Sequence, residues 1–215
     1  MKADNRGILI VFSGFSGAGK GTVMQRLLEQ YKDQYALSIS ATTRPPRPNE
    51  EDGREYFFKT RKEFEKMIEK NELIEYALYV ENYYGTPKAY VEEQLSAQKD
   101  VILEIEIQGA LKVKELFPDT LLLFVAPPDA RTLQERLTGR GTEDVSAVGA
   151  RLSRAAEEAA YMDAYDYLVI NDTLDECVRQ VHSIIRNEHR RVSRNREFIS
   201  KIKEELKSVP KGDET

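Results

Sequence analysis

The feature that most constrains the fold is an apolar strand that runs directly into a glycine-rich turn and then into a helical pattern. Residues Ile8–Phe12 are continuously apolar and rich in β-branched side chains, which is typical of a strand buried on both faces of a parallel sheet. The turn contains Gly14, Gly17 and Gly19, and from about Lys20 to Tyr31 the apolar side chains recur at helical spacing. A strand, a tight loop and a helix in this order predict the opening of an α/β domain.

Later segments of the chain repeat the buried-strand character. Apolar, β-branched runs occur at residues 101–105, 121–125 and 167–170, and helical sequence follows each of them, the last helix being expected at about 174–189. Strands that alternate with helices predict an α/β fold with a parallel sheet and flanking helices.

Two stretches between these strands have a different character. From about residue 38 to 96, short apolar runs such as Tyr56–Phe58 and Leu73–Tyr76 are separated by Pro, Gly and Asn, which predicts a small mixed lobe. From about 129 to 164 the sequence is rich in Arg and Glu and has no strand signal, which predicts a helical flap. We therefore expect a single domain with these parts: a core at about 1–37, 97–128 and 165–192, the lobe at about 38–96, the flap at about 129–164, and a C-terminal helical extension at about 193–215.

Charge and composition exclude several classes of protein. The chain has 215 residues and a formal net charge of -5, whereas broad nucleic-acid binding needs a surplus of Lys and Arg. Apolar runs such as Ile8–Phe12 are too short to cross a bilayer, and the N-terminus lacks the apolar segment of a signal peptide. The single cysteine, Cys177, excludes an internal disulfide framework and is typical of a reducing cytosol. We expect a cytoplasmic protein that binds neither nucleic acid nor membranes.

The C-terminal tail carries a helical stripe of Phe198, Ile202 and Leu206. This stripe predicts an additional surface helix, and a segment that binds a partner is the alternative.

The turn after the first strand has the glycine and lysine frame of a nucleotide-binding P-loop. Its glycines let the backbone aim N–H groups at a phosphate, the helix that follows adds positive potential, and Lys20 supplies a mobile cation. The alternative is a tight turn with a surface lysine. The residues expected to hold ATP are Gly14, Phe15, Ser16, Gly17, Ala18, Gly19, Lys20, Gly21 and Thr22.

The loop departs from the common P-loop pattern at one position. The Ser or Thr that usually follows the lysine is Gly21 here, and Thr22 comes one residue later. The hydroxyl that holds Mg²⁺ in many nucleotide hydrolases is therefore missing at that position. This pattern resembles nucleoside-monophosphate kinases, in which Mg²⁺ is held largely through the ATP phosphates and water, and Thr22 would then contact a phosphate.

A second loop offers a site for another phosphate. Arg44 and Arg47 lie three residues apart in a loop stiffened by Pro45, Pro46 and Pro48. Guanidinium groups match the geometry of phosphate, and proline lowers the entropic cost of holding them in place. Two solvated surface arginines are the alternative, which the P-loop upstream makes less attractive.

Taken together, the motifs resemble those of guanylate kinases from Ile8 to about Leu174. They are the P-loop, Ser40-Ala41-Thr42-Thr43-Arg44 with Pro46-Arg47 and Gly53, Tyr83-Tyr84-Gly85-Thr86, Ile107-Gln108-Gly109 and Arg140-Gly141-Thr142. The resemblance implies a P-loop NTPase-type parallel sheet, a GMP-binding lobe and a helical lid. It also implies that Arg44, Arg47, Tyr56 and Tyr84 hold the GMP phosphate, that Ser40, Glu75 and Thr86 read the guanine, and that Glu104 and Glu106 lie near the ribose and the metal–phosphate centre. The family often has aspartate at the positions of Glu104 and Glu106, so each carboxylate here reaches one methylene further.

The chemistry of Glu75 agrees with this implied role. Guanine presents an N1–H and an exocyclic amine as donors, and an ionised carboxylate accepts from both, whereas adenine has an unprotonated N1 in that place. Without the resemblance, a surface carboxylate on an edge strand would be the simpler interpretation of Glu75.

Phosphoryl transfer needs alignment and charge neutralisation more than covalent chemistry. The resemblance implies that Arg136, Arg140 and Arg151 of the flap clamp the migrating phosphoryl group, with Lys20 and Arg44 as further cations, and that Asn171 touches the adenine of ATP. Arg136 and Arg140 share a face if their helix continues, and Arg154 is expected on a solvated face. His182 and His189 are expected to be surface or packing residues.

The function implied by the resemblance is transfer of the γ-phosphoryl group of ATP to GMP, and to dGMP, with Mg²⁺ as the companion of ATP, by a monomer or homodimer. Two alternatives stay open: a kinase for another small phosphorylated metabolite, and a catalytically inactive module of the same shape that binds peptides. Loss of the P-loop would favour the module, and this chain keeps the loop.

Overall fold

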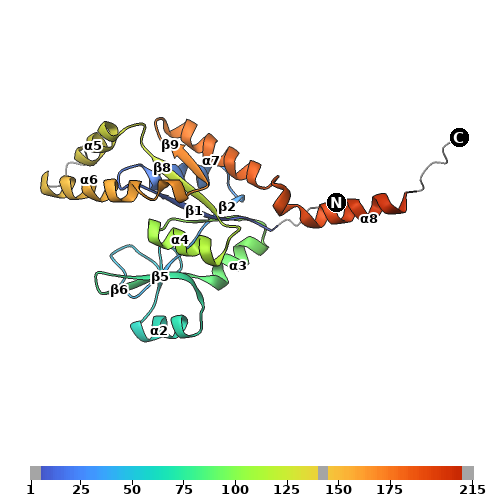
Figure 1. The fold of residues 1–215 in the computed structure, drawn as a ribbon. Coiled ribbons are helices and arrows are strands. Elements are labelled where there is room, and N and C mark those ends of the chain that lie inside the picture. The colour runs from blue at the N-terminus through green and yellow to red at the C-terminus, as the bar shows by residue number, and fades with distance from the viewer. Residues whose placement is uncertain (1–5, 140–144, 210–215) are drawn as a thin grey trace.

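The computed structural model describes residues 6–139 and 145–209 (Figure 1). Its core is a five-stranded parallel sheet in the order β2-β7-β1-β8-β9. The strands are β1 (Leu9–Gly14), β2 (Tyr35–Leu37), β7 (Asp100–Leu103), β8 (Leu121–Ala126) and β9 (Tyr167–Ile170). The α/β fold with a parallel core that the sequence predicts is confirmed.

Helices cover both faces of this sheet. On one face, α1 (Lys20–Gln30) and α7 (Leu174–Glu188) pack against Ile10 and Phe12 of β1. On the other face, α3 (Lys88–Ser96) and α4 (Ile107–Leu116) pack in the cluster that contains Val11. Successive residues of β1 thus point to opposite helical layers, which explains why the strand is apolar without alternation.

The central strand β1 has β7 on one side and β8 on the other. The chain leaves β1 into the P-loop and α1, and it leaves β7 into α4. The loops after these strands therefore meet at the carboxyl edge of the sheet, where open α/β sheets bind their ligands.

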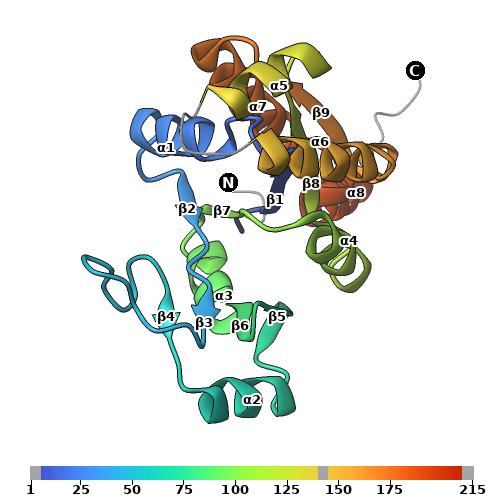
Figure 2. The same cartoon turned by 90° about the vertical axis from the view of Figure 1, so that its left-hand side faces the viewer.

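The lobe inserted between α1 and β7 has its own four-stranded sheet, in the order β4-β3-β6-β5. Its helix α2 (Arg61–Glu69) begins with a capping box between Thr60 and Glu63, and Phe64 from this helix stacks on Tyr83 at 5.1 Å. The lobe strands are β3 (Ala41–Thr42), β4 (Phe57–Phe58), β5 (Leu73–Tyr79) and β6 (Asn82–Pro87). In Figure 2 this sheet lies below the core, joined to it through β2, β3 and α3.

The flap consists of α5 (Ala130–Thr138), α6 (Val145–Ala159) and the short 3₁₀ turn η1 (Met162–Ala164). Leu133 and Leu137 of α5 pack on Ala155 of α6. Helix α5 ends at Thr138, so the helical continuation that would place Arg136 and Arg140 on one face is not found in the described residues. Arg140, with Gly141 and Thr142, lies outside the described residues.

After α7, the turn η2 (Val192–Arg194) leads into α8 (Arg196–Ser208), which extends away from the body of the molecule (Figure 1). Its stripe of Phe198, Ile202 and Leu206 is exposed. Within residues 6–139 and 145–209, no helix combines the length and apolar character that a membrane span requires.

Both histidines and the cysteine have packing roles. His182 stacks on Tyr31 at 3.6 Å and its Nδ1 lies 2.6 Å from the hydroxyl of Tyr35. His189 Nε2 lies 2.8 Å from a carboxylate oxygen of Asp100 at the start of β7. Cys177 is fully buried in the core, and burial raises the pKa of its thiol to about 11.

Candidate functional site

The P-loop has a backbone that only glycine accommodates at its two ends. A Cβ at Gly14, where φ is +151°, would lie 2.1 Å from the carbonyl oxygen of Val125 in the neighbouring strand. Gly19 caps the N-terminus of α1 with a φ of +88°, and a Cβ there would lie 2.5 Å from Nδ2 of Asn171. Since L-residues rarely adopt such angles and these neighbours leave no space, the loop depends on both glycines.

The side chain of Lys20 folds back onto the first residues of this loop. Its Nζ donates hydrogen bonds to the carbonyl oxygens of Gly14 at 2.7 Å and Phe15 at 3.1 Å. The positive charge is therefore held where the N-terminus of α1 already favours an anion.

Asn171, directly after β9, joins the P-loop to the flap. The buried side chain of Asn171 donates from Nδ2 to the carbonyl oxygen of Ala18 at 2.8 Å. The backbone carbonyl oxygen of Asn171 accepts from the Arg136 guanidinium at 2.9 Å. The sequence analysis assigned Asn171 to the adenine, and that contact stays a prediction. Its support of the loop backbone was not foreseen, because the partner lies 153 residues earlier in the chain.

In the lobe, Glu75 on β5 and Thr86 on β6 lie side by side. The Thr86 hydroxyl, which is fully buried, donates to Oε1 of Glu75 at 2.7 Å. Loss of solvent raises the pKa of Glu75, whereas the hydrogen bond from Thr86 and the charge of Lys112 lower it. The outcome is a half-buried carboxylate in which one oxygen is already oriented by a hydroxyl.

A stability measurement tests this environment. Because the pKa of Glu75 is raised in the folded state, its ionised form opposes folding, and that opposition grows as the pH rises through the raised pKa. We expect Glu75→Gln to raise the melting temperature at pH 7, and we expect the gain to vanish below the ordinary glutamate pKa of about 4.3. Glu72→Gln is the control, because it removes the same negative charge from an exposed side chain. A gain equal in both variants, or one that persists at pH 3, would contradict the assignment.

The two arginines of the proline-stiffened loop share one carboxylate. Arg44 pairs with Glu50 Oε1 at 2.9 Å, and the backbone N–H of Arg47 donates to the other oxygen of Glu50 at 2.7 Å. The guanidinium of Arg44 also lies 5.3 Å from the ring centre of Tyr56, whose ring is 6.0 Å from that of Tyr84. Three of the residues expected at the GMP phosphate are thus brought together.

Glu50 was missed by the sequence analysis. It accepts from the backbone N–H of Arg47 within a tight turn, and this bond, followed by the contact with Arg44, lowers its pKa. The signal in the sequence is a carboxylate three residues after an arginine in a proline-rich turn, which is too common to stand out. Its carboxylate binds the guanidinium of Arg44 and the backbone N–H of Arg47, as an anion in this loop would.

The remaining predicted residues lie on both sides of the P-loop. Partial loss of solvent raises the pKa of Glu104 after β7, while Lys20 lowers it, so Glu104 and Lys20 interact electrostatically. Glu106 is the N-cap residue of α4, and its carboxylate contacts Arg154 at 2.6 Å. Arg151 lies on α6.

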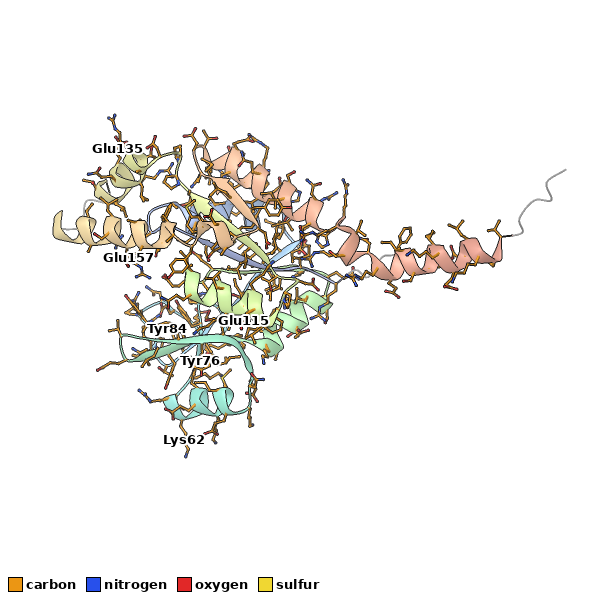
Figure 3. All side chains as sticks on the ribbon, viewed as in Figure 1. Lys62, Tyr76, Tyr84, Glu115, Glu135 and Glu157 are labelled. Carbon is orange, nitrogen blue, oxygen red and sulfur yellow. The ribbon has the colours of Figure 1, made fainter. Side chains whose placement is uncertain are left out.

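In Figure 3, Tyr84 lies on the side of the lobe that is nearer to the flap, and the label of Glu157 marks α6 of the flap. Ser40 immediately precedes β3, where its carbonyl oxygen accepts from the backbone of Phe57 at 2.9 Å. One group of predicted residues therefore belongs to the core and flap, and the other to the lobe.

Comparisons with known proteins agree with this arrangement. The sequence model of the family described as guanylate kinase matches residues 6–188. A guanylate kinase from Streptococcus thermophilus is 50% identical over 189 residues, 88% of this chain and 90% of the relative. One from Lactococcus lactis is 51% identical over 189 residues, 88% of this chain and 92% of the relative.

A solved structure agrees as well. The guanylate kinase from Anaplasma phagocytophilum superimposes with a TM-score of 0.70 at 30% identity, covering 89% of this chain and 91% of that protein. The family predicted from the motifs is confirmed, and the chain belongs to the guanylate kinase family.

Proposed function

We propose that this chain transfers the γ-phosphoryl group of ATP to GMP, giving ADP and GDP. The observation that carries this proposal is the Glu75–Thr86 pair in the lobe of a chain that keeps an intact P-loop. The enzyme is an ATP:GMP phosphotransferase, in agreement with the names of its relatives.

Guanine selection follows from the chemistry of that pair. The oxygens of Glu75 accept from N1–H and the exocyclic amine of guanine, and Thr86 holds the carboxylate in a fixed orientation. Adenine presents an acceptor where the carboxylate needs a donor, and unpaired polar groups in a partly dehydrated site are costly. Ser40, at the start of the same sheet, completes the set assigned to the base.

The GMP phosphate binds to the cluster of Arg44, Arg47, Tyr56 and Tyr84. The Glu50 carboxylate pairs with Arg44 and orients the loop through the backbone N–H of Arg47. An incoming phosphate competes with that carboxylate, since guanidinium groups bind either anion through the same forked geometry.

ATP binds through the loop Gly14–Thr22, with Lys20 as the cation for its outer phosphates. Mg²⁺ fits this donor set as a companion of ATP. Gly21 offers no hydroxyl, so phosphate oxygens and water would hold the metal, and the carboxylates of Glu104 and Glu106 would lie near it. When bound, it neutralises charge on the phosphates. Closure of the flap places Arg136, Arg140 and Arg151 at the migrating phosphoryl group. Asn171, which follows the core strand β9 beside the P-loop, contacts the adenine.

A coupled assay of ADP release with ATP and Mg²⁺ tests this function directly. We expect fast turnover with GMP and dGMP and little with AMP, UMP or CMP, each supplied alone. Fast turnover with another acceptor would assign the enzyme to a different metabolite. No turnover with any acceptor, from protein with a cooperative melting transition, would overturn the kinase assignment in favour of a peptide-binding module.

A further inference from the structure

The salt bridge between Arg154 and Glu106 joins two parts of the site that are far apart in the sequence. Arg154 lies on α6 of the flap, and Glu106 is the N-cap residue of α4, in the loop that follows β7. The Arg154 guanidinium contacts Glu106 Oε2 at 2.6 Å. The sequence analysis expected Arg154 on a solvated face, and its side chain is indeed exposed. The contact with a residue assigned to the metal–phosphate centre was not foreseen.

A second carboxylate fixes the orientation of Arg154. Nε of Arg154 donates to Glu158 Oε1, one helical turn further along α6, at 3.0 Å. The Glu158 side chain is only 14% exposed, and its other oxygen is buried without a hydrogen-bond partner in the described part of the chain. An arginine held by such a neighbour loses less side-chain entropy when it binds Glu106.

Arg154 also separates two like charges. Burial is the main cause that raises the pKa of Glu158, and repulsion from Glu106 raises it further, while Arg154 and the P-loop residue Lys20 lower that pKa. Without Arg154, Glu106 would face Glu158 directly, and its exposed side chain would be free to turn into solvent.

From these contacts we propose that Arg154 is a positioning residue, which holds the Glu106 carboxylate at the junction of flap and core so that its orientation depends on where α6 lies. The proposal rests on the proposed function, in which Glu106 acts close to the transferring phosphoryl group. Both side chains are more than half exposed, so the bridge is weak enough to form and break as the flap moves.

The kinetic test is a double-mutant cycle of Arg154→Ala and Glu106→Gln. We expect Arg154→Ala to lower kcat by roughly 10-fold, with the KM for ATP and GMP changed less than about two-fold, because a misplaced group costs up to about 10²-fold in rate. In the Glu106→Gln background the same change is expected to have little further effect, because residues that act through one contact are not additive. Arg154→Lys keeps the positive charge but loses the forked set of guanidinium donors, and it is expected to restore part of the rate.

Arg131→Ala is the matched control. Arg131 forms an i,i+4 pair with Glu135 at 2.9 Å on the neighbouring flap helix, but this pair stays within that helix. We expect its kcat to be that of the parent protein. An unchanged kcat in Arg154→Ala, or an equal loss with and without Glu106, would overturn the proposal.

Hydrogen exchange separates this proposal from the proposed function. In the nucleotide-free protein, Arg154→Ala is expected to speed amide exchange in α6, whereas Arg131→Ala is not, because Arg154 pairs with Glu106 at the start of α4 and Arg131 pairs within its own helix. This readout needs no turnover, so a protein that failed the kinase assay would still report on the bridge. Equal exchange in α6 of both variants and the parent protein would show that the bridge does not hold the flap.

Discussion

Glu75→Gln is expected to lower kcat/KM for GMP by about 10⁴-fold while leaving the KM for ATP close to that of the parent protein. Glutamine keeps the oxygen that accepts from Thr86, but it places an amide donor where the second carboxylate oxygen accepts from guanine. A site built for a hydrogen-bonding pattern discriminates strongly because every mismatch leaves polar groups unpaired. The measurement is steady-state kinetics with GMP and AMP as acceptors.

Glu72→Gln serves as the control, since it removes the same charge from an exposed position three residues away. Its kcat/KM for GMP is expected to match that of the parent protein. If Glu75→Gln retained the preference for GMP over AMP, Glu75 would not be the residue that reads the base. The melting temperature of Glu75→Gln at pH 7 is the second control: a value at or above that of the parent protein excludes unfolding as the cause of a loss of activity.

Arg136→Ala is expected to lower kcat by about 10³-fold or more, with a much smaller change in the KM for GMP. An arginine that stabilises the charge of the transferring phosphoryl group is worth about 10³–10⁵ in rate, or about 4–7 kcal/mol. Helix α5 already holds the Arg136 guanidinium against the carbonyl oxygen of Asn171, whose side chain supports the P-loop. The residue therefore lies next to the ATP loop before the flap closes.

Single-turnover kinetics would separate the chemical step from substrate binding in Arg136→Ala. Arg131→Ala, on the same helix, is the control, and Arg136→Lys tests whether charge alone suffices. A loss confined to KM would assign Arg136 to ground-state binding of ATP. A loss shared equally by Arg131→Ala would point to disruption of α5 instead.

Much of the core could be predicted from local sequence. The apolar run before Gly14 and the helical spacing after Lys20 predict β1 and α1 because both strand burial and helix formation leave a periodic pattern among neighbouring residues. In the lobe the prediction was less complete. Strands β3 and β4 are two residues long, so their local patterns are weak. Helix α2 had a usable signal, the capping box of Thr60 and Glu63 followed by Phe64, Met67 and Ile68 on one face, which the sequence analysis did not use.

The residue types that the chemistry requires were also visible in the sequence. The P-loop frame, the arginine pair and Glu75 could be chosen because phosphate and guanine each demand particular donors and acceptors. The hydrogen-bond partners and ion pairs of these residues could not be predicted in the same way. The pairing of Glu75 with Thr86 depends on the register of β5 and β6. The contacts of Glu50 with the Arg44 guanidinium and the Arg47 backbone N–H depend on a turn.

What the sequence by itself determined is the fold class and the family, because these depend on patterns within short segments. The residues of the site were predicted from the same patterns. Only the tertiary structure decided which groups, distant in the sequence, form ion pairs or hydrogen bonds with each other. Asn171 reaches Ala18 across the sheet, and Arg154 reaches Glu106 from the flap, 48 residues away in the chain. Sequence spacing carries no record of such contacts, because they arise only when the packing of strands and helices brings separate segments to the same edge of the sheet.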